Sequence, residues 1–501
     1  MKLLRCFVLA AWVRLIMPAS ILASPNLLPE PGLTPTKGVP VNEPAIALTL
    51  EDCVRKAVLE GTPVLKSEYQ MEFSGAQLLQ AYGQFLPNFT GAANYGYGTG
   101  TTYSTVATPT YVTSSGTNAS YAVSTDLNIF NGVSDQATLK SALLKYSAAN
   151  LNLYRAKQQI KLDVIQSFYQ VVLDHRLVDI SESNLRTSRE RERLFSAQVE
   201  VGQRHLSDYF QQQARTSAQE LQLLSLRNTM LRDQLALLKR LRLDVTKRYL
   251  FIEPKLRTEV DIDKSKIRHK NPTRHGPPTP LTTLEDYAEI PDEKTLIEIA
   301  LVDRMDLKAT SELSDAENWD VRTATSGYLP KVDLVAGLTS GAHYLDSLMI
   351  NGAEAVPVIQ NNIAYQLGNQ IQYTVGLTFT WTLFDRFLTH QSIIRLQTIA
   401  KDTALDLQDL KNTVEADVRQ AYGNYITSIQ QLRASAIGLE AAQKSYEVLE
   451  GRYSLGGVNL LDLLTGQDIL VQAESSRAQA LINFQLQNDA LSFATGEMPI
   501  E

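Results

Sequence analysis

The chain of 501 residues is poor in cysteine, with only Cys6 and Cys53. Cys6 lies in an N-terminal segment that we expect to be removed after export. Cys53 is then left alone, so we expect no intrachain disulfide. No cysteine follows closely after that segment, which argues against a lipid anchor on a new N-terminal cysteine.

Proline is absent from two long internal blocks, between Pro109 and Pro254 and between Pro357 and Pro499. A proline inside a helix removes a backbone donor and clashes with the preceding turn, so helix interiors exclude it. Two blocks of more than a hundred residues without proline therefore predict long helices. In contrast, six prolines mark residues 24–47 as an extended N-terminal lead.

Long hydrophobic runs are also missing beyond the N-terminus. No later segment has the roughly 18 consecutive apolar residues that a transmembrane helix needs. Lys2 and Arg5 precede an apolar stretch that ends in small residues, which is the pattern of a secretory signal peptide at residues 1–23. An exported chain without a membrane helix is periplasmic, secreted, or held in the outer membrane as β-strands.

Basic charge and catalytic motifs are scarce as well. The formal net charge is −7, whereas nucleic-acid-binding proteins carry basic patches, so we expect no nucleic-acid partner. The chain has no P-loop and no nucleophile elbow, and none of its six histidines has zinc-ligand spacing. We therefore expect a protein that is not an enzyme and that holds no cofactor or metal.

What the chain does have is an internal repeat. Phe130 in a Leu-Asn-Ile-Phe-Asn-Gly motif matches Phe384 in Trp-Thr-Leu-Phe-Asp-Arg, 254 residues later. The same offset relates Gly202 to Gly456. This order of features, found twice, predicts a tandem duplication of a unit of about 250 residues. We divide the mature chain into repeat 1 (48–250), a linker or equatorial segment (251–291) and repeat 2 (292–498).

Each repeat contains two segments in which apolar residues alternate with small or polar ones, most clearly between Tyr373 and Leu383. A period of two with one apolar face is typical of a β-strand. We expect one β-hairpin per repeat, at 88–130 and 331–384, with strands of about ten residues. The expected loops are Gly98 to Gly116 and His343 to Gln370.

Helices are expected before each hairpin. The first runs from Leu50 to about Phe85, and its counterpart in repeat 2 runs from about Thr295 to Tyr328. Both end at a Leu-Pro pair, because the residue before a proline is pushed out of the helical region.

A longer helix is expected after each hairpin, because apolar residues recur there every seven positions and so predict a left-handed coiled coil. These are Val164, Val171, Val178 and Leu185 in repeat 1, and Val418, Tyr425, Leu432 and Leu439 in repeat 2. The first coil extends from about Gly132 to Gly202, roughly 100 Å at 1.5 Å per residue. Glycines then turn the chain back into a second helix, from about Ser207 to Tyr249 or from Asn459 to Ala494.

Four strands of this length fit an outer membrane but cannot enclose a pore alone. Known barrels begin at about 8 strands, and an open sheet edge cannot sit in lipid with its backbone groups unpaired. Several chains must therefore share one barrel, and three chains would supply twelve strands. The charged helices then project into the periplasm.

This order of features resembles the TolC-like outer membrane efflux family. The resemblance covers about Leu48 to Met498 and rests on Phe85-Leu86-Pro87, the strand exit Asn128 to Gly132, and Tyr453 to Leu464. It implies an α+β membrane protein: a homotrimer whose shared 12-stranded barrel continues into a long antiparallel α-helical coiled-coil tunnel.

The resemblance also implies a function and partners. The function is the outer-membrane exit duct of a tripartite efflux pump or a type I secretion system, with a large periplasmic portion. The implied partners are a periplasmic adaptor (membrane fusion) protein, an inner-membrane transporter and the outer-membrane lipid. A competing interpretation is a periplasmic coiled-coil scaffold protein without a pore, against which the apolar strand face argues.

For the periplasmic gate, the resemblance implies aspartates at Asp462 and Asp208 and a latch tyrosine at Tyr453. The sequence departs from the family at Thr465, where a second aspartate is expected, and at Val458, where a latch arginine is expected. A ring of aspartates attracts cations. Asp462 also fits a plain helix start, where the helix dipole stabilises a carboxylate by about 0.3–1 kcal/mol. The expected adaptor contacts are the hairpin tips, at Gly202, Gln203, Gly456, Gly457 and Val458, with plain turns as the alternative.

Overall fold

The computed structural model describes residues 46–105, 110–256, 292–355 and 362–500. The signal peptide expected at 1–23, most of the lead expected at 24–47 and most of the linker expected at 251–291 lie outside these residues. All elements described below belong to one compact unit, formed by Ile46–Val245 and Tyr249–Glu501.

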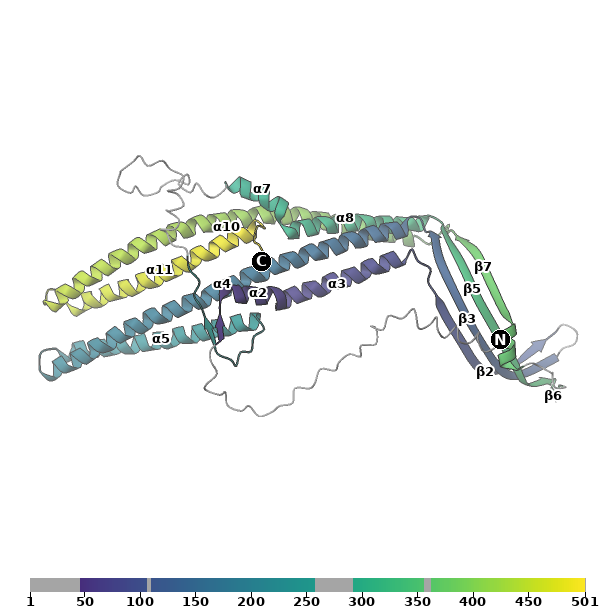
Figure 1. Ribbon diagram of the computed structural model, residues 1–501, viewed down its shortest axis with the longest axis horizontal. Coiled ribbons are helices and arrows are strands. Elements are labelled where there is room, and N and C mark those ends of the chain that lie inside the picture. The colour runs from purple at the N-terminus through teal and green to yellow at the C-terminus, as the bar shows by residue number, and fades with distance from the viewer. Residues whose placement is uncertain (1–45, 106–109, 257–291, 356–361, 501) are drawn as a thin grey trace. The chain divides into compact units, whose positions relative to one another are not determined.

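Four long helices form two hairpins: α4 (Ser134–Glu200) with α5 (Leu206–Arg240), and α10 (Leu388–Ser454) with α11 (Leu460–Ala494). Every bound in the second hairpin follows its counterpart in the first by 254 residues, the offset that the sequence predicts. The 67 residues of α4 correspond to about 100 Å of helix. Figure 1 shows the turns of both hairpins at the opposite end of this unit from the strands.

The seven-residue repeat marks the buried stripe of the long helices. In α4 its four members are at most 6% exposed: Val164, Val171, Val178 and Leu185. In α10, Val418 and Leu432 are fully buried, whereas Tyr425 and Leu439 are half-buried. The coiled-coil prediction is therefore confirmed, with the tightest packing in repeat 1.

The return helix of repeat 1 is shorter than expected. The sequence predicts a helix that continues to Tyr249, but α5 ends at Arg240, and Arg242 takes a left-handed backbone conformation with φ of 53°. Tyr249–Phe251 instead form a short strand, β4, that pairs in parallel with β1 (Ile46–Leu48). Phe251 from this pair packs edge-on against Phe168 of α4 in the largest buried cluster.

The helix expected from Leu50 to Phe85 is in fact two helices, α2 (Leu50–Glu60) and α3 (Thr62–Gly83). Gly61 between them has an extended backbone, and a proline follows in the first turn of α3. A Cβ atom at Gly61 would lie 2.3 Å from the carbonyl oxygen of Ala57, so only glycine fits this break. A capping box at Thr49 begins α2.

In repeat 2 the corresponding helix is interrupted in the same way, but the residue at the break is an arginine and not a glycine. The helix expected from Thr295 to Tyr328 divides into α7 (Glu293–Asp303), α8 (Met305–Thr325) and the 3-10 turn η2 (Ser326–Tyr328). Arg304 has an extended backbone between the first two. Helix α8 packs against both α4 and α10, and so joins the two long hairpins.

One antiparallel sheet carries the strands in the order β2 (Thr90–Ser104), β3 (Thr110–Phe130), β5 (Lys331–Ile350) and β7 (Ile371–Thr380). The two predicted hairpins are thus joined through the pairing of β3 with β5. The predicted strand length of about ten residues is wrong for β2, β3 and β5, which have 15, 21 and 20 residues. Only β7 has ten.

The expected loops are also wrong in part. Residues expected in the loop from Gly98 to Gly116 largely continue β2 and β3. Those expected between His343 and Gln370 complete β5 and then form β6 (Ala353–Glu354) and the short helix α9 (Ile363–Asn369). Strands rich in glycine, serine and threonine have no apolar alternation, so the sequence pattern could not show their ends. In the described part of the chain, no helix is long and apolar enough to span a membrane.

Candidate functional site

The sheet has one apolar face that is open to its surroundings. Tyr373, Val375, Leu377 and Phe379 of β7 are all at least 65% exposed. The register continues this face across the sheet, because Leu377 lies opposite Leu334, which lies opposite Leu127. An exposed apolar face of this extent needs an apolar environment.

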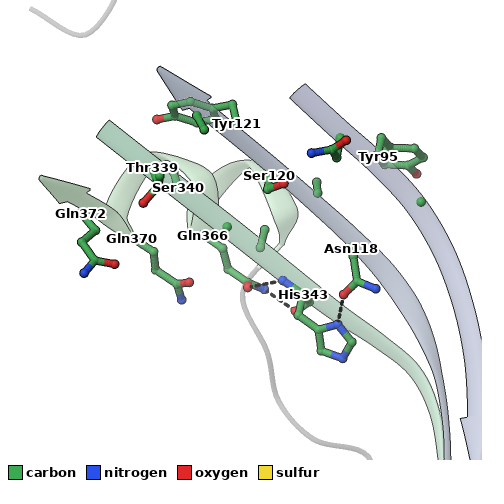
Figure 2. Close-up of a pocket in the computed structure, with 16 residues that line it drawn as sticks. Tyr95, Asn118, Ser120, Tyr121, Thr339, Ser340, His343, Gln366, Gln370 and Gln372 are labelled. Atoms are coloured by element: carbon green, nitrogen blue, oxygen red, sulfur yellow. Dashed lines mark hydrogen bonds between the residues drawn. The ribbon is translucent and has the colours of Figure 1, made fainter. Parts of the chain in front are cut away.

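The other face of the same sheet is polar. Thr378 lies opposite Asp333, which lies opposite Asn128. Further from the helices this face is hollowed to a volume of about 1060 Å³, and the residues that line it include Asn118, His343 and Gln372 but no Asp, Glu, Lys or Arg. Figure 2 shows His343 and Asn118 in contact across two strands. A sheet with one apolar and one polar face separates lipid from water.

The sheet ends on both sides in an unpaired strand. Among the described residues, β2 pairs only with β3, and β7 pairs only with β5. The backbone donors and acceptors on these two outer edges are therefore open to a further strand.

The predicted tip residues lie where the sequence placed them, at the turns of the two helical hairpins. Gly202 and Gly456 both have φ of 74°, and a Cβ atom on either would meet nothing within 4 Å. Their conformation alone selects glycine. Gly202, Gln203, Gly456 and Gly457 are exposed, whereas Val458 is half-buried.

The two predicted gate aspartates have different surroundings. The Asp462 side chain is exposed near the start of α11, where its backbone N–H donates to Asn459 Oδ1 at 2.9 Å. Asn459 thus caps this helix, and no described side chain bonds to the Asp462 carboxylate. Asp208 is half-buried and forms an ion pair with Arg204, with 3.4 Å between Nη1 and Oδ2.

Tyr453 lies in the last turn of α10, at the tip of the second hairpin. Its hydroxyl accepts a 2.7 Å hydrogen bond from Arg204 Nη1, and it packs beside Phe195, Leu460 and Leu464 in a small buried cluster. The Arg204 guanidinium also stacks on the Phe195 ring, with 3.9 Å from Cζ to the centroid. The residues of this cluster come from both hairpins.

Arg204 could not be predicted from the sequence, because the resemblance implies a latch arginine at the position of Val458 in the second hairpin. The arginine that bonds to Tyr453 in the structure instead comes from the turn of the first hairpin. Two further arginines of the first hairpin also reach the second: Arg191 donates to Gln467 Oε1 at 2.5 Å, and Arg215 donates to the Leu464 carbonyl at 3.2 Å. No periodic pattern reveals these contacts, because they join segments about 250 residues apart.

The described residues contain no group of three or more His, Cys, Asp or Glu side chains arranged to hold a metal ion. Cys53 is buried, and this burial raises the pKa of its thiol to about 12, which keeps it protonated and unreactive.

A comparison with protein families shows which family the chain belongs to. The profile of the family described as "Outer membrane efflux protein" matches residues 57–241 and 296–497. The chain belongs to this family. The two matched segments fall in the two repeats, and family membership places the protein in the outer membrane.

Individual relatives are distant. The outer membrane protein TolC of Escherichia coli is 23% identical over 184 residues, which cover 37% of this chain and 36% of TolC. The chain thus spans about a third of TolC's length. The outer membrane efflux protein BepC of Brucella suis is 21% identical over 458 residues, covering 91% of this chain and 86% of BepC.

A solved structure supports the fold of this family member. The CmeC outer membrane channel of Campylobacter jejuni superposes with a TM-score of 0.69 at 16% identity, covering 89% of this chain and 85% of CmeC. The long helices and the curled sheet are therefore an outer-membrane channel fold, as the sequence resemblance implied.

Proposed function

We propose that three copies of this efflux protein form one outer-membrane exit duct. The observation that carries the proposal is the four-stranded sheet with an exposed apolar face and two unpaired edges. The edges belong to β2 and β7, which run in opposite directions along the sheet, so β2 of one copy pairs antiparallel with β7 of the next. Such pairing closes the wall without leaving a backbone edge in lipid.

Three copies supply twelve strands, above the roughly 8 at which known barrels begin. The polar faces then surround a water-filled bore, and the helical hairpins continue that bore into the periplasm. Efflux across the cell needs a pump behind such a duct. We infer that an inner-membrane transporter and a periplasmic adaptor deliver cargo to it, as in a tripartite efflux pump or a type I secretion system.

The hairpin tips would form the periplasmic mouth. Asp462 is exposed there and unpaired, so three copies would place three carboxylates around the opening and favour cations. Asp208 is partly neutralised by Arg204, so it contributes less to that field. Arg204 and Tyr453 would hold the two hairpins together in the closed mouth.

Single-channel recording in planar bilayers tests this function. The purified oligomer should give a small, cation-selective conductance that trivalent cations block from the periplasmic side. Asp462→Asn should weaken both the selectivity and the block. Glu447→Gln is the matched control, because Glu447 is an exposed carboxylate on α10 before the tip. An anion-selective channel, or equal behaviour of the two variants, would contradict the gate.

The adaptor contact is tested separately from the pore. Gln203 is exposed on the turn of the first hairpin, so Gln203→Trp should obstruct docking of a partner without entering the bore. Export of cargo by cells should then fall, whereas bilayer conductance of the purified variant stays unchanged. A loss of both, or of neither, would contradict a docking role for this tip.

A further inference from the structure

The two open edges of the sheet differ in length. The edge of β2 has 15 residues, whereas that of β7 has ten. In the proposed ring each β7 edge receives a β2 edge from the next copy. Five residues of every β2 strand are therefore left without a strand partner at the seam.

The register within the sheet shows which five these are. Thr90, the first residue of β2, lies in one row with Ser124, Gly337 and Thr374. Strand β7 continues from Thr374 for six more residues toward the helices. Thr90 and Thr380 are the ends of β2 and β7 that lie nearest the helices. When these two ends are aligned at the seam, Thr90 of one copy pairs with Thr380 of the neighbouring copy.

This register also matches the faces of the two strands. It sets Tyr97 opposite Tyr373 and Tyr95 opposite Val375, and all four side chains are at least 65% exposed. An even offset keeps the apolar residues of both strands on the lipid side, whereas an odd offset would turn one set into the bore. The unmatched overhang is then Gly100–Ser104, at the end of β2 far from the helices.

Helix α9 lies where β7 would continue along β5. The Gln366 side-chain amide accepts from the His343 N–H at 3.0 Å and donates to the His343 carbonyl at 3.0 Å. These are the two bonds that a residue of a neighbouring strand would make. Further along, β6 pairs with Met349 and Ile350. The β5 edge beyond β7 is thus covered at these points from within the chain.

Two hydroxyl groups fix α9 on the outer side of the sheet. Tyr121 Oη and Ser340 Oγ both donate to the Leu367 carbonyl, at 3.3 and 2.9 Å. Ser340 lies opposite Ile371 and two residues from Leu338, so it points to the apolar face. The exposed side of α9 includes Tyr365, which is 55% exposed.

We propose that α9 is the docking element for the overhang of a second copy: it receives Gly100–Ser104 of the neighbouring β2 and seals the seam where β7 has ended. This rests on the proposed shared barrel. Thr101 and Tyr103 are separated from Tyr97 by even numbers of residues, so their side chains lie on the same face of the sheet as Tyr97, which is the face that carries α9. Tyr103 and Tyr365 are both 55% exposed within one copy, so docking would cover a large side chain on each side of the seam.

Cysteine cross-linking in outer membranes tests the inference with three pairs in the full chain. Tyr97→Cys with Tyr373→Cys reports the seam itself. Thr101→Cys with Tyr365→Cys reports docking on α9. Thr113→Cys with Tyr365→Cys is the matched control, because Thr113 lies opposite Thr101 on β3, one strand further from the seam. Ala364 is exposed beside Tyr365 and offers a second position if that variant folds poorly.

After treatment with a short bifunctional maleimide, the first two pairs should both give covalent trimers, and the control several-fold fewer. Single-cysteine variants show that buried Cys53 does not contribute. If the seam pair links but the α9 pair equals the control, α9 faces lipid and this inference is overturned while the barrel stands. If no pair links and the chain is monomeric, the proposed function itself fails.

Discussion

Arg204 and Tyr453 lie 249 residues apart in the chain, yet the guanidinium of one donates a 2.7 Å hydrogen bond to the hydroxyl of the other. Arg204 belongs to the turn of the first helical hairpin, and Tyr453 to the last turn of α10 in the second. The same guanidinium stacks on Phe195 and pairs with Asp208. One side chain therefore ties both hairpins together at their tips.

Loss of Arg204 should loosen the mouth of the duct. A hydrogen bond to a charged group contributes about 1.5–3 kcal/mol, so Arg204→Ala should raise single-channel conductance clearly, and Tyr453→Phe should raise it less. Arg189→Ala is the control, because Arg189 pairs with Glu220 within the first hairpin. Unchanged conductance in a correctly folded Arg204→Ala oligomer would show that this bond does not hold the mouth closed.

Arg304 should be among the most sensitive positions for stability. It is 4% exposed and binds Asp306 through two nitrogen atoms and Asp417 through a third, at 2.7 to 3.1 Å. Arg304→Ala leaves Asp306 without its main partner and should cost about 3 kcal/mol in unfolding free energy. Arg419→Ala, which removes an exposed pair with Glu293, should cost less than about 1 kcal/mol. Thermal unfolding measures both, and equal costs would contradict the buried network.

Asp174 should make the first hairpin more stable in mild acid. It lies 4% exposed in α4, where burial and the nearby Asp233 raise the pKa of its carboxyl from 3.8 to about 6. A raised pKa means that the folded state binds the proton more tightly, so stability is greatest below about pH 4 and is lost as pH rises through 6. Asp174→Asn should remove this dependence and stabilise the hairpin at pH 7 by on the order of 1–2 kcal/mol.

Hydrogen exchange of α4 and α5 amides between pH 4 and 7 measures this effect. The charges that bear on Asp174 are Asp233 and Arg232 of α5, and Gln170 of α4 donates to its Oδ1 at 3.0 Å. Asn retains that acceptor, so the hydrogen bond survives the substitution. A pH dependence that persists in Asp174→Asn would assign it to another group.

Gly202 should tolerate substitution only at a backbone cost. Its φ of 74° is open to glycine but strained for alanine, and space is not limiting because nothing lies within 4 Å of a Cβ atom there. Gly202→Ala should therefore destabilise the turn by about 1 kcal/mol, and Gly202→Asn by less. Faster exchange of the amides near the tip would show this, and equal exchange in the alanine variant would contradict it.

The long helices could be predicted from the sequence because their packing requires apolar residues at a regular spacing. Val164 and Val171 recur at the spacing that a coiled coil requires. The long block without proline predicts a helix as long as α4. The break at Gly61 had a local signal in its Gly-Thr-Pro sequence, which the prediction of one continuous helix did not use. The break at Arg304 had none, because the salt bridges that hold it join α4, α8 and α10.

The candidate site could be predicted only where local chemistry dictates it. Gly202 and Gly456 mark turns by conformation, so their positions followed from residue type. The partner of Tyr453 did not, since Arg204 comes from another hairpin and only tertiary packing brings it near. Helix α9 was missed for the same reason: Gln366 takes the role of a strand residue, and no sequence pattern distinguishes it from a loop glutamine.

The central claim is that four strands per chain are completed by neighbouring copies. Native mass spectrometry of the protein extracted from outer membranes in mild detergent measures the number of chains directly. We expect a single species with three chains, together with no protein in the aqueous fraction before detergent is added. A monomer, or a chain that is fully soluble without detergent, would contradict it.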